Sequence, residues 1–98
     1  MSTYKGVKRL AVERPEWIPK VLACLECHKK YGEFAGNWVR KLLEEKEGKK
    51  IWFPGLRTLV SYGILKKVDT ARGGRRAYYI LIEPEEVEKA LRELGYLK

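Results

Sequence analysis

The chain has few of the residues that catalysis and metal binding require. Its 98 residues include no glutamine, one asparagine (Asn37), one aspartate (Asp69), one histidine (His28) and one methionine (Met1). With so few titratable candidates and no glycine-rich phosphate loop, the sequence does not assemble a nucleophile, a base and a group to orient that base. The composition therefore predicts a protein that is not an enzyme, with no catalytic residues and no cofactor.

Long hydrophobic runs are absent as well. No apolar stretch approaches the ~18 residues of a membrane span, and charged residues interrupt the short apolar stretches of residues 1–14, unlike a signal peptide. Abundant lysine and glutamate beside the missing glutamine are typical of proteins that work at high temperature. We expect a cytoplasmic protein of a thermophile, without a membrane partner.

The two cysteines lie in CLECH, from Cys24 to His28. Cys-x-x-Cys-His is the attachment sequence of c-type haem, but the chain offers no second histidine for the other axial position. Zinc requires four ligands, so these three residues would need a second chain to complete a site. We therefore expect no metal site in the monomer, and a metal shared by a dimer remains open. The helical wheel predicts a half-buried Cys24 and a more exposed Cys27 and His28.

The sequence is rich in positive charge, and that charge is concentrated. The net charge is +8, and residues 48–82 carry eight basic residues and one acidic residue, a net +7. Residues 1–47 carry +3 and residues 83–98 carry −2. A concentrated basic region indicates a polyanionic partner, whereas an even basic coat would indicate solubility alone.

Hydrophobic periodicity predicts an α+β protein that is mostly helical. A first helix lies in residues 14–32, with Ile18, Val21, Leu22 and Leu25 on its apolar side. A short connection, EFA, leads to a second helix in residues 37–48, for which Asn37 is the expected N-cap. The third helix is expected to begin at Pro54 and to end at Gly63.

A strand-like composition, rich in β-branched and aromatic residues, follows the third helix in ILKKVD and RAYYILI. Residues 64–82 read as a β-hairpin with its tip near Gly73 and Gly74, and either Tyr79 and Leu81 or their neighbours anchor its return strand to the core. Residues 84–94 are expected to form a fourth helix. Residues 1–14 are expected to be an arm or an edge strand, and residues 15–98 a single domain.

Two passages carry a family resemblance. In LRTLVSYGILKKV a third helix runs straight into a strand, and GGRRAYYIL supplies the return strand. Residues 17–82 thereby resemble the winged helix-turn-helix superfamily, and among its members the small archaeal or bacterial transcriptional regulators. The resemblance implies a three-helix core with the hairpin, residues 64–82, as its wing.

The same resemblance implies double-stranded DNA as the partner. In the family the third helix enters the major groove and the wing lies on the minor groove or the backbone. Arg57 is the best candidate to bind guanine, and arginines at the wing tip suit a narrow minor groove. The full set of expected DNA-binding residues is Lys49, Lys50, Arg57, Thr58, Ser61, Lys66, Lys67, Arg72, Arg75 and Arg76.

Other interpretations stay open. The same basic surface suits RNA or the ribosome, although A-form RNA hides its major groove from a helix, and a protein-interaction module is a third class. The aromatic residues Trp52, Tyr62 and Tyr78 are expected in the core more often than stacked on bases. We expect a homodimer, and the fourth helix either forms its interface, through Val87 and Leu91 among others, or closes the monomer core.

Overall fold

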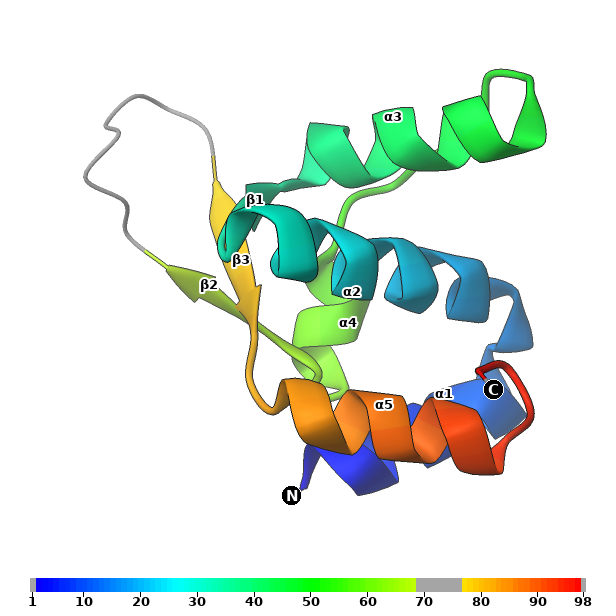
Figure 1. Cartoon of the computed structure of the whole chain (residues 1–98), viewed down its shortest axis with the longest axis vertical. Helices are drawn as coiled ribbons and strands as arrows, with labels where there is room; N and C mark the ends of the chain where they lie inside the picture. Colours follow the sequence, from blue (N-terminus) through cyan, green and yellow to red (C-terminus); the bar gives the residue numbers. More distant parts are fainter. Residues whose placement is uncertain (1, 69–76, 98) are drawn as a thin grey trace.

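The structure, a computed structural model, describes residues 2–68 and 77–97 (Figure 1). It is an α+β fold that is mostly helical, as the sequence predicts. The helices surround a small sheet. The first and last helices of the chain lie side by side, so the two ends of the described chain are at this helix pair. The elements in chain order are α1 (Thr3–Glu13), the 3-10 turn η1 (Pro15–Trp17), α2 (Ile18–Tyr31), β1 (Phe34–Ala35), α3 (Gly36–Glu47), α4 (Arg57–Ser61), β2 (Leu65–Val68), β3 (Tyr78–Leu81) and α5 (Pro84–Glu93).

The sheet has three antiparallel strands in the order β1-β3-β2. The strands β2 and β3 form the predicted hairpin, with Val68 opposite Tyr78 and Leu65 opposite Leu81. Strand β1 was not predicted, because two residues carry no alternation to detect. The hairpin tip near Gly73 and Gly74 lies outside the described residues.

Residues 3–13 form helix α1, so the expectation of an arm or edge strand is wrong. The Ser2 hydroxyl oxygen accepts a hydrogen bond from the Lys5 amide and caps the helix. The buried face consists of Thr3, Gly6, Val7 and Leu10. Only two of these four residues are large and apolar, and three cations lie between them, so the helical period was hidden in the sequence.

Helix α1 packs against α5 over their length (Figure 1). Val87, Ala90 and Leu91 of α5 are completely buried. The apolar stripe predicted for residues 84–94 is therefore confirmed, and it closes the core of a single chain. Val87 and Leu91 are consequently not exposed to a second copy, whereas Tyr96, just after the helix, is 45% exposed.

Two predicted helix starts are wrong for backbone reasons. Helix α3 begins at Gly36 with Ala35 as its N-cap, because β1 holds Ala35 in extended geometry; Asn37 lies inside the helix. Helix α4 begins at Arg57 rather than at Pro54. Gly55 has φ +104°, which no residue of a right-handed helix adopts, so the helix forms only after it. The predicted stop at Gly63, with φ +77°, is confirmed.

Helix α2 contributes both cysteines to the core. Cys24 is 0% exposed and Cys27 2% exposed, so the prediction of a more exposed Cys27 is wrong; its side of α2 is covered by α3. Burial raises the pKa of the Cys27 thiol and raises that of Cys24 well above its usual range.

Both thiols should therefore resist labelling in the native chain. Iodoacetamide at mildly alkaline pH should modify neither cysteine, because the reactive thiolate is rare and the sulfur atoms are covered. In denaturing urea both should react at the rate of a free thiol. Mass spectrometry after timed quenching measures this, and rapid native labelling of Cys24 would contradict the packing of α2.

Candidate nucleic-acid interface

The described cations of the expected interface come from three consecutive segments. Lys49 and Lys50 lie in the loop between α3 and α4, Arg57 begins α4, and Lys66 and Lys67 lie on β2. All five are exposed. Strand β2 is an edge strand with a neighbour on one side only, and both of its lysines are exposed to solvent. Arg72, Arg75 and Arg76 lie outside the described residues.

These five cations differ from many others in having no carboxylate partner. Within residues 2–68 and 77–97, none of the five forms an ion pair. Elsewhere, five basic side chains lie 2.8 to 3.5 Å from a glutamate oxygen, and these are Lys8, Arg9, Lys29, Arg40 and Lys46. Among the described residues no carboxylate neutralises these exposed cations, and their charge is available there to a polyanion.

The polar residues of α4 are less available than Arg57. The Ser61 hydroxyl donates to the Thr58 carbonyl oxygen at 2.7 Å, and Thr58 is half-buried. The turn that follows α4 is closed by hydrogen bonds from the Gly63 amide to Val60 and from the Ile64 amide to Leu59. Because α4 has five residues, it presents one exposed cation at its start and little more.

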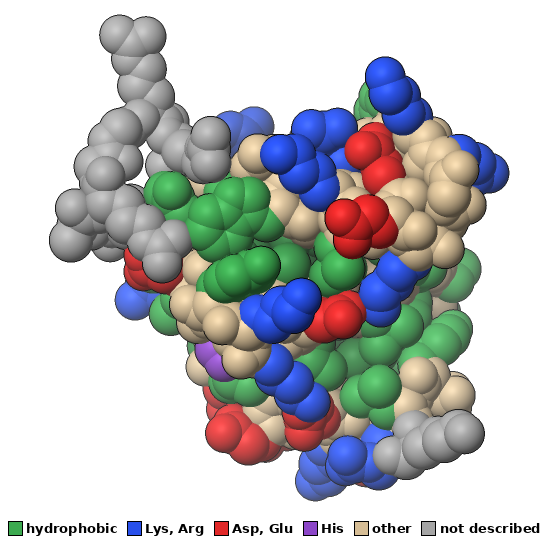
Figure 2. Space-filling view, turned by 45° about the horizontal axis from the view of Figure 1, so that its top comes forward, with side chains coloured by type: hydrophobic (Ala, Val, Ile, Leu, Met, Phe, Trp, Pro, Cys, Tyr) green, Lys and Arg blue, Asp and Glu red, His purple; other side chains and the backbone are tan. Residues whose placement is uncertain are grey.

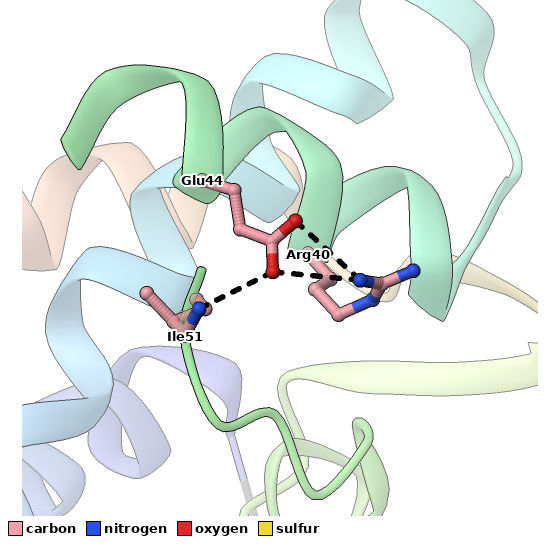
Figure 3. A network of polar contacts seen from close by, with 3 residues as sticks. All are labelled: Arg40, Glu44 and Ile51. Atoms are coloured by element: carbon pink, nitrogen blue, oxygen red, sulfur yellow. Dashed lines mark hydrogen bonds and ion pairs between the residues drawn. The ribbon is translucent and has the colours of Figure 1, made fainter. Parts of the chain in front are cut away.

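A polar network fixes the loop that precedes α4 (Figure 3). The Ile51 amide donates to Glu44 Oε2 at 3.2 Å, and Arg40 Nη1 lies 3.4 Å from both carboxylate oxygens of Glu44. Ile51 and Phe53 pack against the core, whereas Trp52 between them is 83% exposed. The expectation that Trp52 belongs to the core is therefore wrong, while Tyr62 and Tyr78 are buried as expected.

Removing the Glu44 carboxylate should loosen this loop. Glu44→Ala takes away the acceptor of the Ile51 amide, and a hydrogen bond to a charged group contributes about 1.5 kcal/mol or more. We expect the Ile51 amide to exchange with solvent about tenfold faster, as measured by NMR hydrogen exchange. Glu45→Ala, one residue along the same helix, is the control and should leave this amide unchanged. Equal exchange in both variants would contradict the tether.

The base of the hairpin is anchored by aromatic packing. Tyr78 of β3 lies edge-on to Trp38 of α3 at 5.7 Å, and Trp38 lies edge-on to Tyr31 of α2 at 5.1 Å. Leu81 belongs to the core and Tyr79 packs against it, as the first of the two predicted alternations has it, and Tyr78 is buried as well, against Trp38. The short strand changes from one packing partner to another along its length.

A groove of about 390 Å³ lies between α2 and α3. Figure 2 shows this face, where hydrophobic side chains are visible among lysine, arginine and glutamate side chains. The lining residues are Cys27, Lys30, Tyr31, Trp38, Lys41, Leu42 and Glu45. Of the described residues expected to bind DNA, none lines it.

Cys24, Cys27 and His28 do not form a metal site. The described part of the chain holds no group of three or more histidine, cysteine, aspartate or glutamate side chains suited to a metal ion. His28 Nδ1 lies 3.1 Å from the Gly32 carbonyl oxygen, and Cys24 is completely buried. A buried Cys24 also cannot reach a metal shared with a second chain.

No helix among the described residues is long and apolar enough to cross a membrane. Comparisons of the chain with protein-family models, with curated protein sequences and with solved structures gave no match.

Proposed function

We propose that this chain is a winged-helix protein that binds double-stranded DNA and regulates transcription. One observation carries the proposal: the region of net charge +7 presents five exposed cations without carboxylate partners among the described residues. Neutralising DNA phosphates releases condensed counterions, and that release supplies most non-specific affinity.

The order of elements supports the winged-helix part of the proposal. Helices α2, α3 and α4, with the short β1 after α2, are followed by the β2–β3 hairpin, an order that supports a three-helix core with a wing. In this assignment α4 faces the major groove, with Arg57 reading base edges. Lys49, Lys50, Lys66 and Lys67 contact phosphates on either side of it.

Arg57 distinguishes DNA from RNA only if its guanidinium reaches the edge of a base. A guanidinium can donate two hydrogen bonds to guanine in the wide major groove of B-DNA. In A-form RNA this groove is deep and narrow, so Arg57 would find only phosphates. RNA binding is therefore the alternative that the same experiment tests.

Fluorescence anisotropy with a random DNA duplex of about 30 base pairs, and with the matching RNA duplex, tests the proposal over a range of salt concentrations. We expect tighter binding to DNA, and a log-log salt slope of several units. Equal or tighter RNA binding would favour the RNA alternative, and no binding to either duplex at low salt would refute nucleic-acid binding altogether.

Arg57 should determine sequence preference. On a site selected from random DNA, Arg57→Ala should cost about 1 to 3 kcal/mol and relax the preference at one base pair. Arg57→Lys is the matched control, because it retains the charge but loses the paired donors. It should retain the salt dependence and lose the preference. Uniform weakening across all sequences in both variants would reduce Arg57 to a phosphate contact.

Binding as a homodimer belongs to the same proposal. A helix of five residues reads few base pairs, and a second copy would double the site, with half-sites about one helical turn apart. Tyr96, which is 45% exposed after α5, is an apolar residue available for such a contact. Sedimentation velocity at several protein concentrations measures the oligomeric state.

A further inference from the structure

Trp52 is the most exposed large hydrophobic residue in the described part of the chain, with 83% of its surface accessible. Of the other two tryptophans, Trp17 is 6% exposed and Trp38 is half-buried against two tyrosines. Leaving an indole in water forfeits the largest burial free energy of any side chain. A reason for this exposure must lie in how the loop is held or in what the indole contacts.

The exposure of Trp52 is imposed by its two neighbours. Ile51 on one side packs inward and its amide is bound to Glu44; Phe53 on the other side also packs against the core. Consecutive side chains of an extended segment alternate between opposite sides. The indole therefore cannot turn inward unless Ile51 or Phe53 leaves its place, and Figure 3 shows how Glu44 and Arg40 hold the Ile51 end.

The surroundings of Trp52 select its partner. Lys49 and Lys50 precede it and Arg57 follows it, and all three are exposed. A flat aromatic face beside several cations suits a ligand that has both phosphates and π-faces, which is nucleic acid. An apolar protein surface would gain nothing from these cations.

The π-face of an indole needs a base with a free face. In a fully paired duplex each base is covered by its neighbours above and below, whereas a bulged or partly unstacked base is open. We propose that Trp52 stacks on an unstacked DNA base next to the duplex that the cations hold. This inference rests on the proposed DNA binding and adds to it the structure of the preferred site.

Two fluorescein-labelled DNA probes of identical sequence test the inference, one a fully paired duplex and the other carrying a two-nucleotide bulge at its centre. Anisotropy measures affinity, and tryptophan emission reports stacking. The wild-type chain should bind the bulged probe about 5- to 150-fold more tightly, the range expected for stacking on one base. Its tryptophan emission should be quenched more strongly by the bulged probe.

Variants at Trp52 and at a matched position complete the test. Trp52→Ala should abolish the preference for the bulge and leave the affinity for the paired duplex unchanged. Trp52→Phe, which retains a smaller aromatic face, should keep part of the preference. The control is Val12→Ala, which removes an apolar side chain that is 82% exposed on α1 and should change neither affinity. Circular dichroism should show native folding for all three, since both positions are exposed.

The outcomes separate the two proposals. If the wild type binds neither probe, the proposed DNA binding fails. If the wild type binds both probes and Trp52→Ala alters neither affinity, or weakens both equally, DNA binding stands and base stacking is overturned. A change in sedimentation rather than in DNA affinity for Trp52→Ala would also overturn stacking, because Trp52 would then lie between two copies of the chain.

Discussion

Replacing Gly6 with alanine should destabilise the fold by about 3 kcal/mol, the upper part of the range for an overpacked core. A Cβ at this position would lie 2.0 Å from the Tyr62 carbonyl oxygen and 3.2 Å from its carbon. These are backbone atoms of the turn between α4 and β2, so no rotamer change relieves the clash. In an isolated helix alanine is more favourable than glycine by about 1 kcal/mol. Helix propensity alone would therefore predict that Gly6→Ala stabilises the fold, whereas the clash predicts that it destabilises it. Urea unfolding followed by circular dichroism measures the change.

Gly36→Ala is the matched control, because it is the same substitution in a helix with space around it. The nearest atoms to a Cβ at Gly36 are side-chain carbons at 3.9 Å, an ordinary contact distance. We expect the free energy of unfolding to change by no more than about 1 kcal/mol, and to increase if the higher helix propensity of alanine is the larger effect. If Gly6→Ala is as stable as the wild type, then α1 does not pack on the Tyr62 turn.

Much of the fold follows from apolar spacing in the sequence. The stripes of residues 18–25 and 87–91 repeat at helical intervals, and the change after Gly63 to β-branched and aromatic residues around a Gly-Gly pair marks the hairpin. Such patterns are visible because Ile18, Val21, Leu25, Val87 and Leu91 are buried, large and apolar. In β3 the predicted anchors Tyr79 and Leu81 contact the core, while the burial of Tyr78 depends on Trp38 of a different helix, which no local pattern indicates.

Helix α1 was missed because its most important contact involves a glycine. Gly6 adds nothing to an apolar pattern. It is required because the Tyr62 backbone, 56 residues away in sequence, packs where a Cβ would lie. Thr3 is buried for a similar reason: its hydroxyl donates to the Gly63 carbonyl oxygen at 2.8 Å. Neither long-range contact leaves a local pattern.

In the candidate site, too, the sequence predicts features of single residues but not features that depend on contacts between distant residues. Positive charge is a property of single residues, so counting along the chain locates the excess in residues 48–82. The choice of Lys49, Lys50, Arg57, Lys66 and Lys67 within that region rests on the winged-helix resemblance. Trp52 is exposed next to Ile51, whose amide donates to Glu44 in the preceding helix. An aromatic residue between two apolar residues is more often buried. The contact between Ile51 and Glu44 leaves no local pattern in the sequence, so the exposure of Trp52 could not be predicted.

The five exposed cations together should dominate DNA affinity. A variant in which Lys49, Lys50, Arg57, Lys66 and Lys67 are all glutamine should bind a random duplex about 100-fold or more weakly at low salt. Each phosphate contact contributes about 0.9 to the log-log salt slope, so the slope should fall by about 4. The fold should be retained, because each side chain is exposed and none forms an ion pair within the described residues. Anisotropy over a salt series measures both quantities.

A second variant with the same loss of net charge shows whether location matters. It replaces five exposed or half-buried cations outside residues 48–82 with glutamine: Lys5, Arg14, Lys20, Lys30 and Lys89. Long-range attraction falls equally in the two variants, whereas direct phosphate contacts fall only in the first. The control should retain a salt slope close to that of the wild type. If both variants lose affinity and slope to the same extent, DNA is attracted by the total charge of the molecule, and no particular face binds it.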